Sequence, residues 1–295
     1  MLSRLMKWFG LTMAALAVVA LGAVAVYVIA ITRDLPSVQT LKNYAPPITT
    51  RVYAGNGTVL GEYARQRRIF IPAAFIPKLV KQAFTSAEDR NFYSHPGIDP
   101  SGILRAAIKD VGLVLQGRRP QGASTITQQV ARNFLLNSDV KFSRKIREAI
   151  LAVRIDATYP KEKILELYLN EIYLGENCYG IGAASLNYFG KSLDELDVAE
   201  VAFLAALPKG PANYDPRRYH AAAVSRRNWV IDQMADNGYI TDAQAAAAKA
   251  EPLVTQTRAL GSQAADVAYY VEEVRRLLIN KYHYKGLYDS GLQVR

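Results

Sequence analysis

The sequence contains very little of the residue types that build disulfide frameworks or metal cages. It has one cysteine, Cys178, and three histidines at the widely spaced positions 95, 220 and 283. A lone cysteine excludes an internal disulfide and a multi-cysteine zinc site, so we expect a buried structural thiol.

Acidic residues are also scarce, with 26 against 36 basic ones and a net charge of +10. This excess indicates an anionic partner, such as nucleic acid, a lipid headgroup or a phosphate-bearing substrate.

Charge is also missing from one long stretch near the N-terminus. Trp8 to Thr32 carries no charged side chain, and its 25 residues are enough for a helix that crosses a hydrocarbon core of about 30 Å. Arg4 and Lys7 precede the stretch, which favours a cytoplasmic N-terminus with the rest of the chain outside. A cleaved signal peptide is the alternative, but the apolar stretch is too long for one. An external location also argues against a nucleic-acid partner.

The remainder of the chain is predicted to be mainly α with a small β element. Residues 50–71 alternate like strands around a Gly55-Asn56-Gly57 turn, a typical hairpin signal. Apolar periodicity and helix stop signals then predict helices over 77–87, 103–115, 142–158, 161–174, 193–207, 219–237 and 241–250. The polar stretch 116–133 is predicted to be a loop, where functional residues often lie.

Two short segments place carboxylates beside fixed positive charge. Glu88 is followed by Asp89 and Arg90 and then by the aromatic pair Phe92-Tyr93. Aromatic neighbours remove water from a carboxyl group and raise its pKa toward a value useful in proton transfer. An ordinary surface ion pair explains the same residues equally well.

Glu148 lies in the second segment, with Arg144 and Lys145 four and three residues before it on a predicted helix. A solvated salt-bridge face is the usual meaning of this spacing. However, residues 105 to 154 contain ten basic residues against three acidic ones. Such a cluster is costly unless an anion neutralises it, and arginine is well suited to phosphate.

Five stretches in order resemble the motifs of the peptidoglycan glycosyltransferases. They are Glu-Asp-Arg-Asn-Phe-Tyr-Ser-His-Pro-Gly-Ile-Asp at 88–99, Gly-Ala-Ser-Thr-Ile-Thr-Gln-Gln at 122–129, Arg-Lys-Ile-Arg-Glu at 144–148, Lys-Glu-Lys-Ile-Leu-Glu-Leu-Tyr-Leu-Asn at 161–170, and Gly-Ile-Gly-Ala-Ala at 180–184 through Ala-Ala-Leu-Pro at 205–208. With the apolar N-terminal stretch, the chain is most similar to class A penicillin-binding proteins. One departure is Arg132, which stands where the family has a lysine.

The resemblance implies a lysozyme-like fold and a division of the chain into three parts. Residues 1–35 would be the cytoplasmic N-terminus and transmembrane anchor, and 36–255 the peptidoglycan glycosyltransferase domain. Residues 256–295 would begin the connection toward a transpeptidase domain, whose Lys-Thr-Gly signature is missing here. The resemblance also implies a bacterial cytoplasmic (inner) membrane protein with a periplasmic or extracellular catalytic domain.

The resemblance further implies that lipid II is polymerised into β-1,4 glycan strands, with inversion and with release of undecaprenyl pyrophosphate. Glu88 would be the general base and Glu148 would organise the donor site. The phosphates would be held by the cationic side chains of Arg132, Arg144, Lys145 and Arg147. Mg²⁺ or Mn²⁺ would assist them, although the sequence does not identify the ligands of a metal ion. Further substrate contacts would come from Asp89, Arg90, Ser124 and Gln128.

The expected partners are lipid II, the growing glycan strand, the membrane and regulators of cell-wall synthesis. Two alternatives stay open at this point. One is a lytic transglycosylase or lysozyme-like hydrolase, and the other is a catalytically silent membrane-anchored scaffold. The intact carboxylates Glu88 and Glu148 argue against the scaffold.

Overall fold

The protein is described from a computed structural model covering residues 2–33, 35–43, 49–57, 59–63, 66–105, 124–136, 142–256 and 268–295. Its longer helices are α1 (Leu2–Arg33), α2 (Lys78–Glu88), α4 (Ile126–Leu135), α5 (Phe142–Thr158), α6 (Lys161–Glu171), α7 (Ile181–Phe189), α8 (Val198–Ala206), α9 (His220–Asp236), α10 (Asp242–Ala250) and α11 (Ala268–Asp289). The strands are β1 (Thr50–Tyr53), β2 (Val59–Tyr63), β3 (Arg67–Arg68), β4 (Cys178–Tyr179) and β5 (Gln293–Val294). The chain is therefore mainly α, as predicted.

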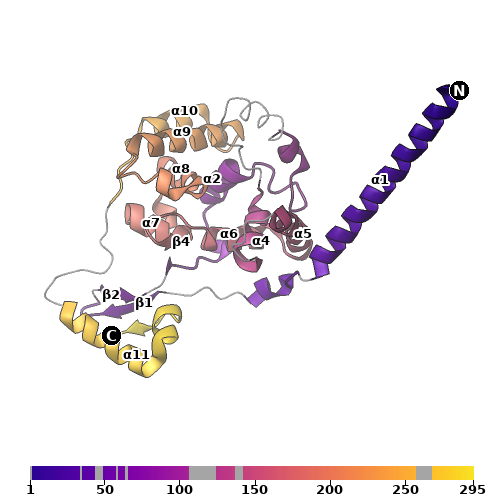
Figure 1. Cartoon of the computed structure of the whole chain (residues 1–295). Helices are drawn as coiled ribbons and strands as arrows, with labels where there is room; N and C mark the ends of the chain where they lie inside the picture. Colours follow the sequence, from indigo (N-terminus) through magenta and orange to yellow (C-terminus); the bar gives the residue numbers. More distant parts are fainter. Residues whose placement is uncertain are drawn as a thin grey trace.

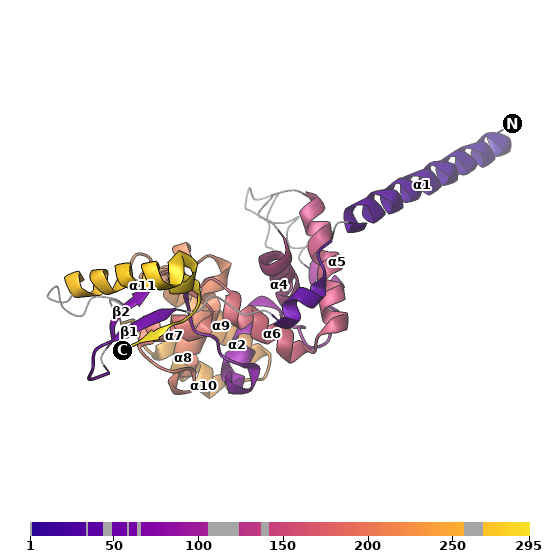
Figure 2. The ribbon, with the colours of Figure 1, turned by 90° about the horizontal axis from the view of Figure 1, so that it is seen from below.

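Helix α1 projects away from the remainder of the protein, and both views place its end beside α5 (Figures 1 and 2). Its segment Trp8–Arg33 has a mean hydropathy of 2.7, long and apolar enough to cross a membrane. Most of the large apolar side chains described between Trp8 and Ile29 are exposed, whereas Ile31 is buried. After α1, Leu41 is buried in the main core, and the Tyr159 hydroxyl donates to the Val38 carbonyl. Among the described residues, the apolar helix is thus attached to the helical body through its C-terminal end.

The helical body is built around two almost fully buried helices, α6 and α8. Residues 164–170 of α6 and 199 and 201–206 of α8 are all buried. Helix α2 packs on α8 and α9, α10 packs on α9, and α4 packs on α5 and α6. Asp197 caps α8 in a reciprocal capping box with Glu200, which satisfies backbone N–H groups that the first helical turn leaves open. The predicted 193–207 helix is therefore interrupted, beginning as a short 3-10 turn, Leu193–Glu195.

A small three-stranded sheet joins residues 50–63 to the C-terminal end of the chain and forms a second structural unit. β1 and β2 are antiparallel around the turn at 55–57, as predicted, and β5 pairs in parallel with β1, giving the order β2-β1-β5. Val52, Leu278 and Leu287 form a separate buried cluster under this sheet, and Figure 1 shows α11 lying along it. The predicted C-terminal part is thus structurally joined to residues 50–63, while the three-part division of the chain remains a prediction.

The polar stretch predicted to be a loop contains a helix. Residues 116–123 lie outside the described residues, but 126–133 belong to α4. Thr125 caps this helix: its hydroxyl accepts from the Gln128 N–H and the Gln128 side chain accepts from the Thr125 N–H. Ile126, Val130 and Ala131 are completely buried. The loop prediction was therefore wrong for this part, and the predicted helix 103–115 is described only for 103–105, which are helical.

Asn170 on α6 binds the extended chain that links the small sheets to the body. Its side-chain carbonyl accepts from the Ile71 N–H at 2.7 Å, while its amide donates to the Ile71 and Glu166 carbonyls at 2.8 Å. One side chain thereby satisfies both backbone groups of Ile71 in a buried place, so its loss takes this partner from the Ile71 N–H and carbonyl, while the Glu166 carbonyl keeps its bond within α6.

We expect Asn170→Ala to destabilise the protein by about 2–4 kcal/mol, since each buried group that loses its partner costs roughly 1–3 kcal/mol. Asn170→Asp keeps the acceptor for the Ile71 N–H but turns a buried carboxylate oxygen toward two carbonyl oxygens, so it should cost at least as much as the alanine variant. Denaturant unfolding measures both changes, with exposed Asn280→Ala as a control that should change little. Equal stabilities for Asn170→Ala and wild type would show that the hydrogen bonds of the Asn170 side chain do not stabilise the fold.

Candidate active site

Glu88 is the last residue of α2 and points to α4. The Gln129 amide donates to Oε2 of Glu88 at 2.9 Å. Burial raises the pKa of Glu88 above its ordinary value of 4.5, while the hydrogen bond from Gln129 and the charges of Arg226, Lys209 and Arg132 lower it. A carboxyl whose pKa is raised in this way suits proton transfer near neutral pH. The surface ion pair considered from the sequence does not describe Glu88.

Asp89 follows Glu88 and holds three parts of the site together. Both its oxygens accept from Nε2 of buried His95, at 2.9 and 3.0 Å, and Oδ2 also accepts from the Ile126 N–H at 2.9 Å. A carboxylate at this helix N-terminus is stabilised by the open N–H groups and by the helix dipole. Because Ile126 begins α4, the contact places Gln129, one turn later, beside Glu88. The predicted substrate contact of Asp89 remains a prediction beside this positioning role.

The loop between Asp89 and Asp99 is fixed at several points. The Thr125 hydroxyl donates to the Gly97 carbonyl at 2.6 Å, and Lys161 donates to the His95 carbonyl at the same distance. Gly97 has a φ of +86°, and a Cβ there would lie 2.4 Å from the Ala152 carbonyl oxygen on α5. Only glycine allows this close approach without displacing α5.

Glu148 lies on α5 in a cationic cluster that was predicted from the sequence. Lys145 donates to Oε2 of Glu148 at 2.9 Å and to the Ser124 hydroxyl at 2.6 Å, while Nε of Arg144 lies 3.2 Å from Oε1. Glu148 is only 1% exposed, so a solvated salt-bridge face is excluded. The Nε of Arg147 on the same helix is buried without a partner among the described residues.

The N-terminal part of α4 connects the two carboxylates. Ser124, just before the helix, contacts Lys145 of the Glu148 cluster, and Gln129 contacts Glu88. The two segments predicted from the sequence to carry the chemistry, around Glu88 and around Glu148, therefore both contact residues 124–129. Lys109, Arg118, Arg119 and Lys141 of the predicted basic cluster lie outside the described residues.

Three cations surround Glu88, and two of them were not predicted. Arg132 of α4 was predicted as a phosphate-binding residue, and its charge lowers the pKa of Glu88. Lys209 follows α8 in the 3-10 turn Leu207–Lys209, and Arg226 belongs to α9. Burial lowers the pKa of both, the charge of Arg226 lowers the pKa of Lys209 further, and the charge of Glu88 raises both pKa values. These residues come from distant sequence segments, so no local pattern identified them. Gln129 was not predicted as a site residue, because the substrate contact was assigned to its neighbour Gln128.

Two predicted substrate contacts have internal partners. The Gln128 side chain is buried and accepts from the Thr125 N–H in the α4 cap. Arg90 is exposed, and its guanidinium donates to the Asp236 carbonyl at the end of α9 at 3.3 Å. These contacts give both residues positioning roles, and direct contact with substrate remains a prediction for each.

No group of three or more His, Cys, Asp or Glu side chains in the described ranges is arranged to hold a metal ion. Glu148 faces Arg144 and Lys145. Because Mg²⁺ at a phosphate is commonly held by one or two carboxylates together with the substrate phosphates, the Mg²⁺ or Mn²⁺ implied by the resemblance remains a prediction. The cationic side chains are the groups that the described site offers to an anionic ligand.

Comparison with known proteins identifies the class of this site. Residues 56–235 match the model of the transglycosylase family, so the chain belongs to that family. The match runs from the β1–β2 turn to α9 and includes every site residue named above. The lysozyme-like helical class expected from the sequence is confirmed by the family and by a solved structure described next.

The individual relatives are proteins called penicillin-binding protein 1A. The chain is 44% identical to that of Rickettsia felis over 282 residues, covering 95% of this chain and 36% of the relative. It is 42% identical to that of Escherichia coli K12 over 261 residues, covering 88% and 30%. The crystal structure of penicillin-binding protein 1A from Haemophilus influenzae matches with a TM-score of 0.50 and 26% identity, covering 84% of this chain and 26% of that one. The chain spans about a third of the length of these relatives.

We expect the difference in stability between wild type and Glu88→Gln to depend on pH in a defined direction. The folded-state pKa of Glu88 is raised, so the group contributes stability below its unfolded pKa of about 4.5 and loses it as pH rises through the folded value. Wild type should therefore lose stability relative to Glu88→Gln as pH rises through this window, by about 1.4 kcal/mol per unit of raised pKa.

Thermal and denaturant unfolding between pH 4 and 8 measure the effect, with Asp194→Asn, an exposed carboxylate outside the site, as the control. A difference between wild type and Glu88→Gln that is independent of pH would contradict the buried, raised pKa.

Proposed function

We propose that this chain is a peptidoglycan glycosyltransferase that polymerises lipid II in bacterial cell-wall synthesis. The observation that carries the proposal is the pair of carboxylates joined by residues 124–129, each beside cationic side chains. Family membership and the penicillin-binding protein 1A relatives support the reaction class. Lipid II, the release of undecaprenyl pyrophosphate and inversion at the anomeric carbon belong to the proposal.

Glu88 acts as the general base in this mechanism. Its carboxylate takes the proton of the acceptor 4-hydroxyl as that oxygen attacks the anomeric carbon of the donor. The bond from this carbon to the pyrophosphate oxygen breaks, and undecaprenyl pyrophosphate leaves with the bonding electrons. An α-linked donor thereby becomes a β-1,4 glycoside. Gln129 and the nearby cations favour the ionised form of Glu88 that the step requires.

The α5 cluster stabilises the charge that gathers on the leaving pyrophosphate. Lys145 is half exposed on its side chain and Arg144 partly so, while Glu148 beneath them is buried. Glu148 therefore orients the two cations from below, and their remaining N–H groups are available to phosphate. Fixed positive charge aimed at a developing anion is usually the largest catalytic contribution.

Helix α1 provides the membrane anchor in this proposal. The lipid tail of the substrate stays in the bilayer, so the site must work at the membrane surface. An apolar helix attached beside α5 keeps that surface near the phosphate cluster. The N-terminus is cytoplasmic and the catalytic domain lies on the outer side of the cytoplasmic membrane.

We expect Glu88→Gln to lower polymerisation by at least about 10²-fold, the lower range for loss of a general base. The assay is incubation with labelled lipid II in detergent followed by sizing of the glycan product, with Asp194→Asn as the control. Near-normal strand synthesis by folded Glu88→Gln protein would remove Glu88 from this role. Release of sugars from purified cell wall without polymer formation would instead support a hydrolase.

We expect Lys145→Ala to reduce turnover of lipid II by roughly 10- to 100-fold, because one charge-assisted hydrogen bond is worth about 1.5–3 kcal/mol. Turnover and thermal stability are measured together, and Arg154→Ala on the same helix is the matched control because Arg154 is exposed outside the cluster. A loss of stability with unchanged turnover would mean that Lys145 serves only to neutralise the buried charge of Glu148.

A further inference from the structure

Arg226 acts on Glu88 but is fixed by an aromatic ring. Its guanidinium carbon lies 3.7 Å from the centre of the Trp229 ring, one turn further along α9. This is a close cation–π contact. Among the charges that lower the pKa of Glu88, that of Arg226 has the largest effect. The two residues lie on helices that pack together, Glu88 at the end of α2 and Arg226 on α9.

The structure gives the Arg226 guanidinium few other attachments. Its Nε is buried without a hydrogen-bond partner among the described residues. The adjacent Arg227 shows a different arrangement, since it donates to the Glu251 and Lys249 carbonyls at 2.7 and 3.1 Å and to the Asn228 side chain. Arg227 is thus a structural arginine that ties α9 to the end of α10, whereas Arg226 depends on Trp229 for its position.

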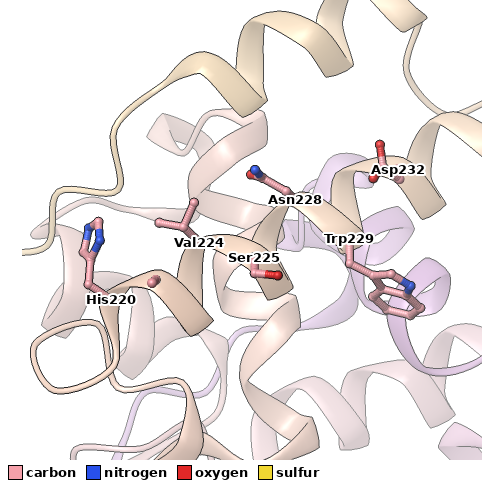
Figure 3. Close-up of a pocket in the computed structure, with 7 residues that line it drawn as sticks. His220, Val224, Ser225, Asn228, Trp229 and Asp232 are labelled. Atoms are coloured by element: carbon pink, nitrogen blue, oxygen red, sulfur yellow. The ribbon is translucent and has the colours of Figure 1, made fainter.

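Trp229 is not required for the core. Its ring is 39% exposed, and the buried face of α9 is formed by other residues, Ala223, Arg227, Val230, Ile231 and Met234. It borders a hollow of about 570 Å³ that also includes His220, Val224, Ser225, Asn228 and Asp232. Figure 3 shows these side chains along α9, with the Trp229 ring extending from the helix. A large ring that contributes little to the core but covers a charged group is suited to holding that group.

We propose that Trp229 is a positioning residue whose ring holds the Arg226 guanidinium in the place from which it acts on the general base, Glu88. The inference deepens the proposed function because it assigns a residue outside the family-like motifs to the same site. Substrate does not need to contact Trp229. Its effect passes through Arg226 alone, and loss of the ring lets the guanidinium move toward solvent.

Several charged or titratable groups face Glu88, and each must be considered in a pH experiment. They are Arg132 beside Gln129 on α4, Lys209 after α8, Arg226 on α9, the buried Tyr168 hydroxyl on α6, and Asp89 with His95 next in the chain. Among them, Arg226 is the one whose contact with Trp229 the structure describes. A change at Trp229 that alters the ionisation of Glu88 therefore identifies Arg226 as the connection.

The first test does not depend on activity. The chain has two tryptophans, Trp8 and Trp229, so in a Trp8→Phe protein the fluorescence comes from Trp229 alone. We expect this fluorescence to titrate at a pH above 4.5, as Glu88 ionises and draws the guanidinium. Glu88→Gln in the same background should abolish the transition, whereas His220→Asn should leave it. A transition that survives in Glu88→Gln, or no transition in the Trp8→Phe protein, overturns the inference.

The second test is the pH profile of lipid II polymerisation. For Trp229→Ala we expect the acidic limb to move to higher pH by about one unit, because a displaced cation no longer lowers the pKa of Glu88. Activity on that limb then falls about tenfold, while the plateau at higher pH changes less. Trp229→Phe, which keeps an aromatic face, should show little of this shift, and Ser225→Ala in the same hollow should behave as wild type.

A uniform loss of activity in Trp229→Ala without movement of the limb would indicate a structural role and overturn the proposal. If Trp229→Ala does not fold, Trp229→Phe and Trp229→Leu are compared, since only the phenylalanine keeps the contact with the cation. Wild-type protein that makes no polymer would refute the proposed function, and the fluorescence titration would still decide the role of Trp229.

Discussion

The site depends on the carboxylate of Asp89. It accepts hydrogen bonds from His95 and from the Ile126 N–H at the start of α4, and so it joins the end of α2 to the beginning of α4. Glu88 immediately precedes it and Gln129 lies one turn after Ile126, which brings the proposed general base and its hydrogen-bond donor together. Because Asp89 is buried, removing one partner leaves the others uncompensated, and such networks fail as a unit.

The charges of the site are arranged in two groups around a common segment of chain. Around Glu88 the cations come from α4, α9 and the turn after α8, while around Glu148 they lie on the same helix. Buried acids and cations in this arrangement compensate each other only partly. In the proposed function, a ligand that carries several negative charges completes the compensation.

Sequence patterns predicted those parts of the protein that local interactions determine. Helices α5 and α6 begin where predicted, because apolar periodicity and Pro160 mark them. Helix α4 was missed because Thr127, Gln128 and Gln129 are polar yet buried, which hides its periodicity; the Thr125–Gln128 capping box was the available signal. Lys209 and Arg226 join Glu88 only through long-range packing. Such contacts leave no spacing rule in the sequence.

The pairing of β5 with β1 has a consequence for biosynthesis. Leu292 and Thr50, which are hydrogen-bonded, are 242 residues apart. At roughly 5–20 residues per second, a ribosome needs on the order of 10–50 s to make the intervening chain. During that interval the β1 edge of the early hairpin has no partner strand, and open edges invite pairing with other chains. The growing protein therefore passes through a period in which aggregation competes with completion of its three-stranded sheet.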